Sequence, residues 1–196
     1  MTAFEKIPHY GRGASLLELL VTMSLVGVLF SAAIPSFIDF SVRNRIVSYS
    51  NEFISAINLA RSEAIRRGTT VSICHSNNNA TCSGSWSSGW IVFANNDGDS
   101  PAAVDAGEPL IRAFPSLSAN FTMQADAALS ADVTFGADGA AIATGVMSVC
   151  HDGLTEDARA IVITSLRPRV ARDTDNNKIP NIDDGTDMVS CALPSG

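Results

Sequence analysis

An unbroken run of apolar residues lies near the start of the chain. Residues 16–34, LLELLVTMSLVGVLFSAAI, carry a single ionisable side chain, Glu18. A helix rises about 1.5 Å per residue, so a helix of this length reaches across the hydrocarbon core of a bilayer. The pattern therefore predicts a transmembrane helix over about residues 16–36.

Beyond Pro35 the apolar residues recur at steps of three and four. They are Ile46, Tyr49, Phe53, Ile57, Ala60 and Ala64. This spacing is typical of an amphipathic helix whose apolar stripe packs on a sheet. Gly68 is a suitable C-terminal stop. We therefore expect one helix over residues 14–67, with a membrane half followed by an amphipathic half.

After Gly68 the pattern changes to short apolar segments separated by Gly, Asn, Asp or Ser. Such segments are typical of antiparallel hairpins and meanders. The predicted strands are 69–74, 90–94, 109–114, 120–123, 132–135, 146–150, 159–164 and 168–171. The sequence thus predicts an α+β fold with the outline of a lollipop, a long N-terminal helix packed on an antiparallel β-rich head at residues 68–196.

The length and the net charge of the chain restrict its domain content and the partners that it can bind. The chain has 196 residues and a formal net charge of -7, which suits one globular domain with an appendage. A chain this acidic is a poor general binder of polyanions, so a nucleic-acid contact would need a local basic patch.

The four cysteines all follow the apolar run, in the turn-rich part of the chain. They are Cys74, Cys82, Cys150 and Cys191. An even count there indicates two disulfides in an oxidising compartment. The spacing favours Cys74 with Cys82 and Cys150 with Cys191, although four cysteines permit three pairings. Together with the short polar segment before the apolar run, this favours a single-pass protein with a cytoplasmic N-terminus and a head in a periplasm-like compartment.

Gly13 stands before the apolar run, whereas a secretory signal peptide is cut after its apolar core. A cut after Gly13 would remove only a polar leader, residues 1–13, and would keep the helix. Glu18 inside a membrane helix would cost roughly 2.5 to 3.5 kcal/mol on insertion scales. The new α-amino group of Ala14 would neutralise Glu18 of a neighbouring subunit. Alternatively, Glu18 reaches from the helix end to the membrane interface.

The order of Gly13, Glu18 as the fifth residue after the cut, and the apolar run resembles the type IV prepilin signal, which the pseudopilins of type II secretion share. The resemblance implies cleavage after Gly13 and N-methylation of Ala14 by a prepilin peptidase, with Glu18 acting in assembly. Ala14 departs from the family, which usually has Phe there. Pro35 falls where pilin helices commonly carry a proline, which bends a helix.

Four further segments, in order along the chain, resemble the GspH/FimT family, especially FimT- and FimU-type minor pilins. They are ARSEAIRRGTTVSIC (60–74), GSWSSGWIVFANNDGD (84–99), GEPLIRAF (107–114) and FGADGAA (135–141). The resemblance implies a structural subunit of a pilus-like filament, with other pilin subunits as its partners. It implies neither an enzyme nor a cofactor. A type II secretion pseudopilin has the same signal and a similar head, and stays open as an alternative.

Two metal hypotheses are weaker than their alternatives. Cys74-His75 and Cys150-His151 would chelate zinc poorly, because adjacent side chains on a strand point to opposite faces. Two runs alternate oxygen-bearing residues in the manner of a calcium loop: Asn95, Asp97, Asp99 and Asp173, Asp175, Asn177. Neither run has the remaining EF-hand residues. We therefore interpret both as acidic turns and expect no metal.

Three arginines cluster near the C-terminus, at Arg167, Arg169 and Arg172. Arginine forks suit phosphate oxygens and would give weak, salt-sensitive DNA binding. Arg167 and Arg169 resemble the Gly-Arg-x-Arg element of FimT-type pilins linked to DNA uptake, although Leu166 replaces the glycine. A DNA-binding minor pilin of natural transformation is thus a second alternative. Otherwise these arginines pair with carboxylates of the acidic tail or of an adjacent subunit.

Overall fold

The computed structural model describes residues 15–183 and 186–192. Gly13, Ala14 and the rest of the predicted leader lie outside the described residues. The chain divides into two compact units, Met1–Ser41 and Val42–Gly196.

One long helix crosses the boundary between the two units. This helix, α1, extends over Leu16–Arg67 and includes Pro35. Gly68 follows with φ 69°, and its N–H donates to the Ala64 carbonyl at 2.9 Å. Glycine adopts this left-handed conformation readily and commonly ends helices in this way. The helix therefore stops at the position that the sequence predicts.

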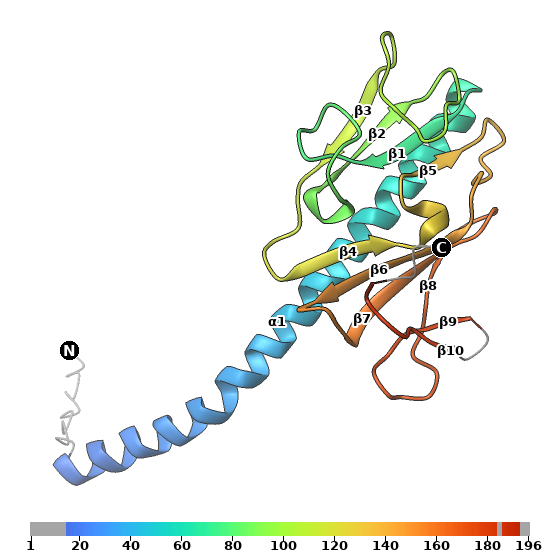
Figure 1. Cartoon of the computed structure of the whole chain (residues 1–196). Helices are drawn as coiled ribbons and strands as arrows, with labels where there is room; N and C mark the ends of the chain where they lie inside the picture. Colours follow the sequence, from blue (N-terminus) through green and yellow to red (C-terminus); the bar gives the residue numbers. More distant parts are fainter. Residues whose placement is uncertain (1–14, 184–185, 193–196) are drawn as a thin grey trace, which may run out of the picture. The chain divides into compact units, whose positions relative to one another are not determined.

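The second unit adds two four-stranded antiparallel sheets and a two-stranded ribbon (Figure 1). The first sheet has the order β3-β2-β1-β5, the second β4-β6-β7-β8, and the ribbon pairs β10 with β9. The elements are β1 Val71–His75, η1 Trp86–Ser88, β2 Trp90–Ala94, β3 Leu110–Phe114, β4 Phe121–Ala125, η2 Ala127–Leu129, β5 Asp132–Phe135, β6 Gly145–His151, β7 Leu154–Ile163, β8 Pro168–Val170, β9 Asn181–Asp183 and β10 Thr186–Asp187. The fold is thus the predicted long helix followed by antiparallel sheets.

All eight predicted strands are present, and β7 differs most from its prediction. It begins at Leu154, five residues before the predicted start at 159. The added residues include Glu156 and Asp157, whose charges obscure the strand pattern, and Asp157 has a positive φ of 60°. The ribbon strands β9 and β10 were not predicted, because they have only three and two residues.

The predicted apolar stripe of α1 forms the centre of the core. Ile46, Phe53, Ile57, Ala60 and Ala64 are fully buried against both sheets, while Tyr49 is half-buried. The Phe53 ring meets the edges of two tryptophans, with centroids 5.6 Å from Trp86 and 5.5 Å from Trp90. Such edge-to-face pairs add to the burial energy. The amphipathic half of α1 is therefore an integral part of the head.

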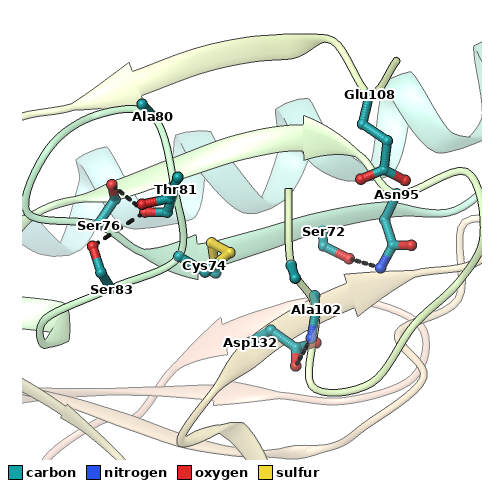
Figure 2. The surroundings of a disulfide bond; sticks show 12 residues. Ser72, Cys74, Ser76, Ala80, Thr81, Ser83, Asn95, Ala102, Glu108 and Asp132 are labelled. Carbon is teal, nitrogen blue, oxygen red and sulfur yellow. Dashed lines mark hydrogen bonds between the residues drawn. A yellow bond between two sulfur atoms is a disulfide. The ribbon is translucent and has the colours of Figure 1, made fainter. Parts of the chain in front are cut away.

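Two disulfides close the head, Cys74 with Cys82 and Cys150 with Cys191. This is the pairing that the spacing favours. Figure 2 shows the first bond beside hydrogen-bonded loops, with Ser76 Oγ donating to the Thr81 carbonyl at 2.7 Å. The second bond holds the C-terminal segment in a small cluster with Ala158, Ala160 and Val162 of β7. The disulfides thus anchor loops that lie outside the main core.

Candidate functional site

The first half of α1 exposes its large apolar side chains on every side within its own unit. They are Leu16, Leu17, Leu19, Leu20, Val21, Met23, Leu25, Val26, Val28, Leu29, Phe30, Ile34, Phe37, Ile38 and Phe40. Among the described residues, α1 is the helix that qualifies as a membrane span by length and composition, with an 18-residue window of mean hydropathy 2.1 that is 0% buried. A helix that is apolar all round belongs in a membrane or a protein core.

Three hydroxyl groups in this half are satisfied by the helix itself. Thr22 Oγ1 donates to the Leu19 carbonyl at 2.9 Å, and Ser24 Oγ to the Leu20 carbonyl at 2.8 Å. Ser31 Oγ likewise donates to the Val28 carbonyl at 2.7 Å. Because these hydroxyls need no water, they do not oppose insertion into an apolar environment.

Glu18 is the acidic residue of the first turn of α1, and its side chain is exposed. Ser15, just before the helix, accepts the Leu17 N–H at 3.3 Å, as an N-cap residue does. A carboxylate in the first turn also interacts favourably with the helix dipole. Over residues 15–183 and 186–192, no cation pairs with Glu18. Of the three residues predicted to act in cleavage and assembly, Gly13, Ala14 and Glu18, only Glu18 lies within the described residues.

In the second unit, Tyr49 joins α1 to the loop between β3 and β4. Its hydroxyl lies 2.5 Å from Ser118 Oγ and accepts the Ser118 N–H at 3.1 Å, while Arg45 Nη1 donates to the same Oγ at 2.7 Å. Burial alone would raise the pKa of Tyr49, but hydrogen bonds with Ser118 and the neighbouring Arg45 bring that pKa below its usual value. This network fixes the helix to the head.

The predicted arginines separate into two groups. Arg169 and Arg172 line an open cleft of about 1250 Å³, whereas Arg167 lies in the exposed turn between β7 and β8. The cleft is lined by Asp157, Ala158, Arg159, Arg169, Val170, Ala171, Arg172, Asp173, Thr174, Lys178, Pro180 and Asn181. Arg169 Nη2 donates to the Ile182 carbonyl at 2.8 Å. Arg159 lies in the predicted strand 159–164 but was not predicted as a residue of this site.

The acidic loop beside this cleft satisfies its own carboxylates. Asp173 accepts the N–H groups of Asn176 at 2.7 Å and Lys178 at 2.8 Å. Burial would raise the pKa of Asp173, but these N–H groups outweigh it and lower the pKa. Asp175 accepts the Asn177 amide at 3.0 Å. The arrangement supports the acidic-turn interpretation of this run.

The other acidic run separates Asn95 from Asp97 and Asp99. Asn95 is fully buried and donates to Ser72 Oγ at 3.0 Å (Figure 2). Asp105 instead joins Asp97 and Asp99, and their carboxylate oxygens lie within 4.8 Å of one another. Exposed acidic groups gather in this way without an ion, so we assign this cluster no function.

The cysteines of the zinc hypothesis are not available as metal ligands. All four cysteines are in disulfides. His75 instead meets Trp86 edge to face at 5.6 Å, and His151 lies on Phe121 with centroids 4.7 Å apart. The histidines thus act as packing groups in the second unit.

Comparisons with known proteins agree with this arrangement. A family model described as Type II transport protein GspH matches residues 50–166. Two crystal structures of the type IV minor pilin FimU of Pseudomonas aeruginosa are similar in fold. The one in space group P21 has a TM-score of 0.55 at 20% identity, over 78% of this chain and 98% of its own. The one in space group P65 has a TM-score of 0.52 at 18% identity, over 74% and 98%. Among curated proteins, none matches significantly.

Proposed function

The chain belongs to the GspH family, and from this premise we propose that it is made as a prepilin and becomes a minor subunit of a pilus-like filament. The apolar half of α1 is the observation that carries the proposal, because such a surface must be covered by lipid before assembly and by other subunits afterwards. Family and fold are those of structural pilins, and we expect no catalytic activity.

Assembly would follow from the chemistry at the start of α1. Cleavage after Gly13 by a prepilin peptidase would remove residues 1–13 and expose the amine of Ala14, which is then methylated. Glu18 lies in an apolar helix with no cation beside it among the described residues, and an Ala14 amine of a neighbouring subunit would neutralise it. Pro35 would bend the helix where subunits pack. Residues 14–67 would form the filament helix and 68–196 the head.

The apolar helix and the disulfides also support a location for the chain in the cell envelope. A single apolar helix near the N-terminus supports anchoring in the inner membrane before assembly. The disulfides Cys74–Cys82 and Cys150–Cys191 support a periplasmic head, since disulfides persist in oxidising compartments.

Two assemblies are candidates for this chain, a type IV pilus and a type II secretion system. The name of the matching family points to type II transport, and the solved structures are type IV minor pilins. We favour a pilus because the segments resemble FimT- and FimU-type pilins. Deletion of the gene should then reduce pilus number or twitching. Loss of protein secretion with normal pili would assign the chain to a pseudopilus instead.

The assembly role is tested by replacing Glu18 with glutamine. We expect Glu18→Gln to insert into the membrane normally and to be depleted at least tenfold from sheared filaments, as measured by immunoblot. Glu52→Gln is the matched control, since Glu52 lies in the head half of α1. Equal incorporation of Glu18→Gln and the wild-type chain would contradict the proposal.

DNA binding is a second candidate function, favoured by the basic lining of the cleft. Arg159, Arg169 and Arg172 line it together with Lys178, and arginines bind phosphates well. If Arg167 also contributes, replacing it together with Arg169 by alanine should reduce DNA retention by the full-length protein and flatten its salt dependence. Unchanged retention across a salt series would exclude this role.

A further inference from the structure

Three large aliphatic side chains are exposed at the end of the head where α1 stops. Ile65 is 53% exposed, Ile142 67% and Leu166 74%. They come from α1, from the loop between β5 and β6, and from the turn between β7 and β8. We call these three residues the aliphatic patch.

Backbone and side-chain contacts join the three elements into one surface. A Cβ atom on Gly139, whose φ is 77°, would lie 2.6 Å from Ile65 Cδ1, so Ile65 lies directly over this loop. The loop is joined to the turn where the Ala141 N–H donates to the Ser165 carbonyl at 3.0 Å. Arg61 Nη1 donates to the Leu166 carbonyl. The three elements that carry the patch are therefore joined to one another.

Two arginines beside the patch lack a carboxylate partner within the described part of the chain. Arg61 donates to a carbonyl group, and Arg167 follows Leu166 in the exposed turn. Asp138, in the neighbouring loop, already accepts the Ala140 N–H at 2.9 Å. In a chain with a net charge of -7, this surface complements a partner that offers an aliphatic side chain flanked by carboxylates.

The opposite end of the head has this complementary chemistry. Leu154, at the start of β7, is 59% exposed. The carboxylates of Asp152 and Glu156 flank it, with side chains 52% and 60% exposed. Glu156 also pairs with Lys178 at 2.7 Å, and the Asp152 carboxylate lies 3.4 Å from His151 Nδ1. Ile163 faces Gly145 and Leu154 faces His151, so β7 extends along six residues of β6, and at about 3.3 Å per residue its two ends lie about 20 Å apart. A contact between opposite ends of successive heads is heterologous, the type that builds open helical filaments.

We propose that the aliphatic patch binds the carboxylate-flanked aliphatic end of the adjacent pilin-like head in the filament. The proposal rests on the proposed filament role. The aliphatic side chains supply the buried contact, and Arg61 and Arg167 select the acidic end over other surfaces.

Photocrosslinking of the full-length chain in filament-forming cells tests this contact. The photoreactive residue p-benzoylphenylalanine is placed at 142, at 166, or at the control position 189, where Val189 is 90% exposed elsewhere on the head. We expect covalent products at 142 and 166 that contain a pilin-like subunit, joined within a few residues of a carboxylate. The yield at 189 should be at least fivefold lower.

A charge reversal adds a second readout. The Arg167 side chain makes no hydrogen bond or ion pair within the described residues, and Arg167→Glu should lower the yield at 142 at least fivefold, whereas Arg112→Glu on β3 should not. Products with DNA, lipid or a non-pilin protein, or equal yields at all three positions, would overturn the proposal. If the chain is present in filaments but these products are missing, only this inference fails. Absence of the chain from filaments would contradict the proposed function itself.

Discussion

The Arg43 guanidinium lies 2.9 Å from the Asp157 carboxylate, so an ion pair joins α1 to β7. The Asp157 N–H donates to the Lys178 carbonyl at 2.8 Å, and Lys178 Nζ pairs with Glu156 at 2.7 Å. These contacts link α1, the inner strand β7 of the second sheet and the C-terminal loop. The start of β7 is therefore a junction between the main core and the C-terminal segment.

Asp157→Asn should lower head stability modestly. The substitution removes the charge that pairs with Arg43, while asparagine tolerates the positive φ at this position. A partly exposed pair of this kind contributes about 0.5–1 kcal/mol. We expect a melting temperature lower by about 1–3 °C, measured by tryptophan fluorescence in detergent. Glu156→Gln, in a more exposed pair, should have a smaller effect, and a larger one would contradict this ranking.

Removing the second disulfide should cost more stability than removing the first. The loop between Cys150 and Cys191 has a sequence separation of 41, compared with 8 for Cys74 and Cys82. Chain entropy then predicts losses of about 4 and about 2.5 kcal/mol for the paired Cys→Ser variants. Limited proteolysis should cut residues 172–180 faster in the variant that lacks Cys150 and Cys191. Equal cutting in both variants would show that the disulfide does not anchor this loop.

Phe53→Ala should destabilise the head severely. Phe53 is fully buried between Trp86 and Trp90, and truncation of a buried phenylalanine costs about 3–5 kcal/mol. We expect little folded protein at 37 °C and loss of the native tryptophan fluorescence. Val189→Ala, at a position 90% exposed, is the control and should stay within about 0.5 kcal/mol of wild type.

Stability should fall on acidification. Hydrogen bonds from Arg66 and Arg67 lower the pKa of Glu63, and one from Lys178 lowers the pKa of Glu156. A carboxylate with a lowered pKa stabilises the folded state above its unfolded pKa of about 4.3, and this contribution is lost as pH falls through the folded value. The denaturant concentration at the midpoint of unfolding should therefore decrease as the pH falls below about 4.3. In the variant Glu63→Gln, this midpoint should depend less steeply on pH. An unchanged slope would contradict this assignment.

Local patterns predicted most of the fold. The stripe from Ile46 to Ala64 identified the buried face of α1, because its spacing reports directly which side of a helix is apolar. Short apolar segments identified β1 to β8. The start of β7 was missed because pairing with β6 and the disulfide to Cys191 stabilise Leu154–Ala158 despite its charged residues. Tertiary context overrides local preference at such positions.

The site was predicted less completely. The cluster at Arg167, Arg169 and Arg172 was visible as a run, but its division between a turn and a cleft depends on how β8 pairs with β7. Arg159 and the aliphatic patch could not be found from sequence, since their members meet only through tertiary contacts. Asn95 was interpreted as part of an acidic turn, and its burial against Ser72, which the sequence did not predict, gives it a structural role.

Mass spectrometry of the chain recovered from sheared filaments tests the central claim most directly. We expect the chain to be present there, with an N-terminal peptide that begins at Ala14 and carries a methylated amine. Recovery only in the membrane fraction, with residues 1–13 still attached, would show that the chain is not a processed filament subunit.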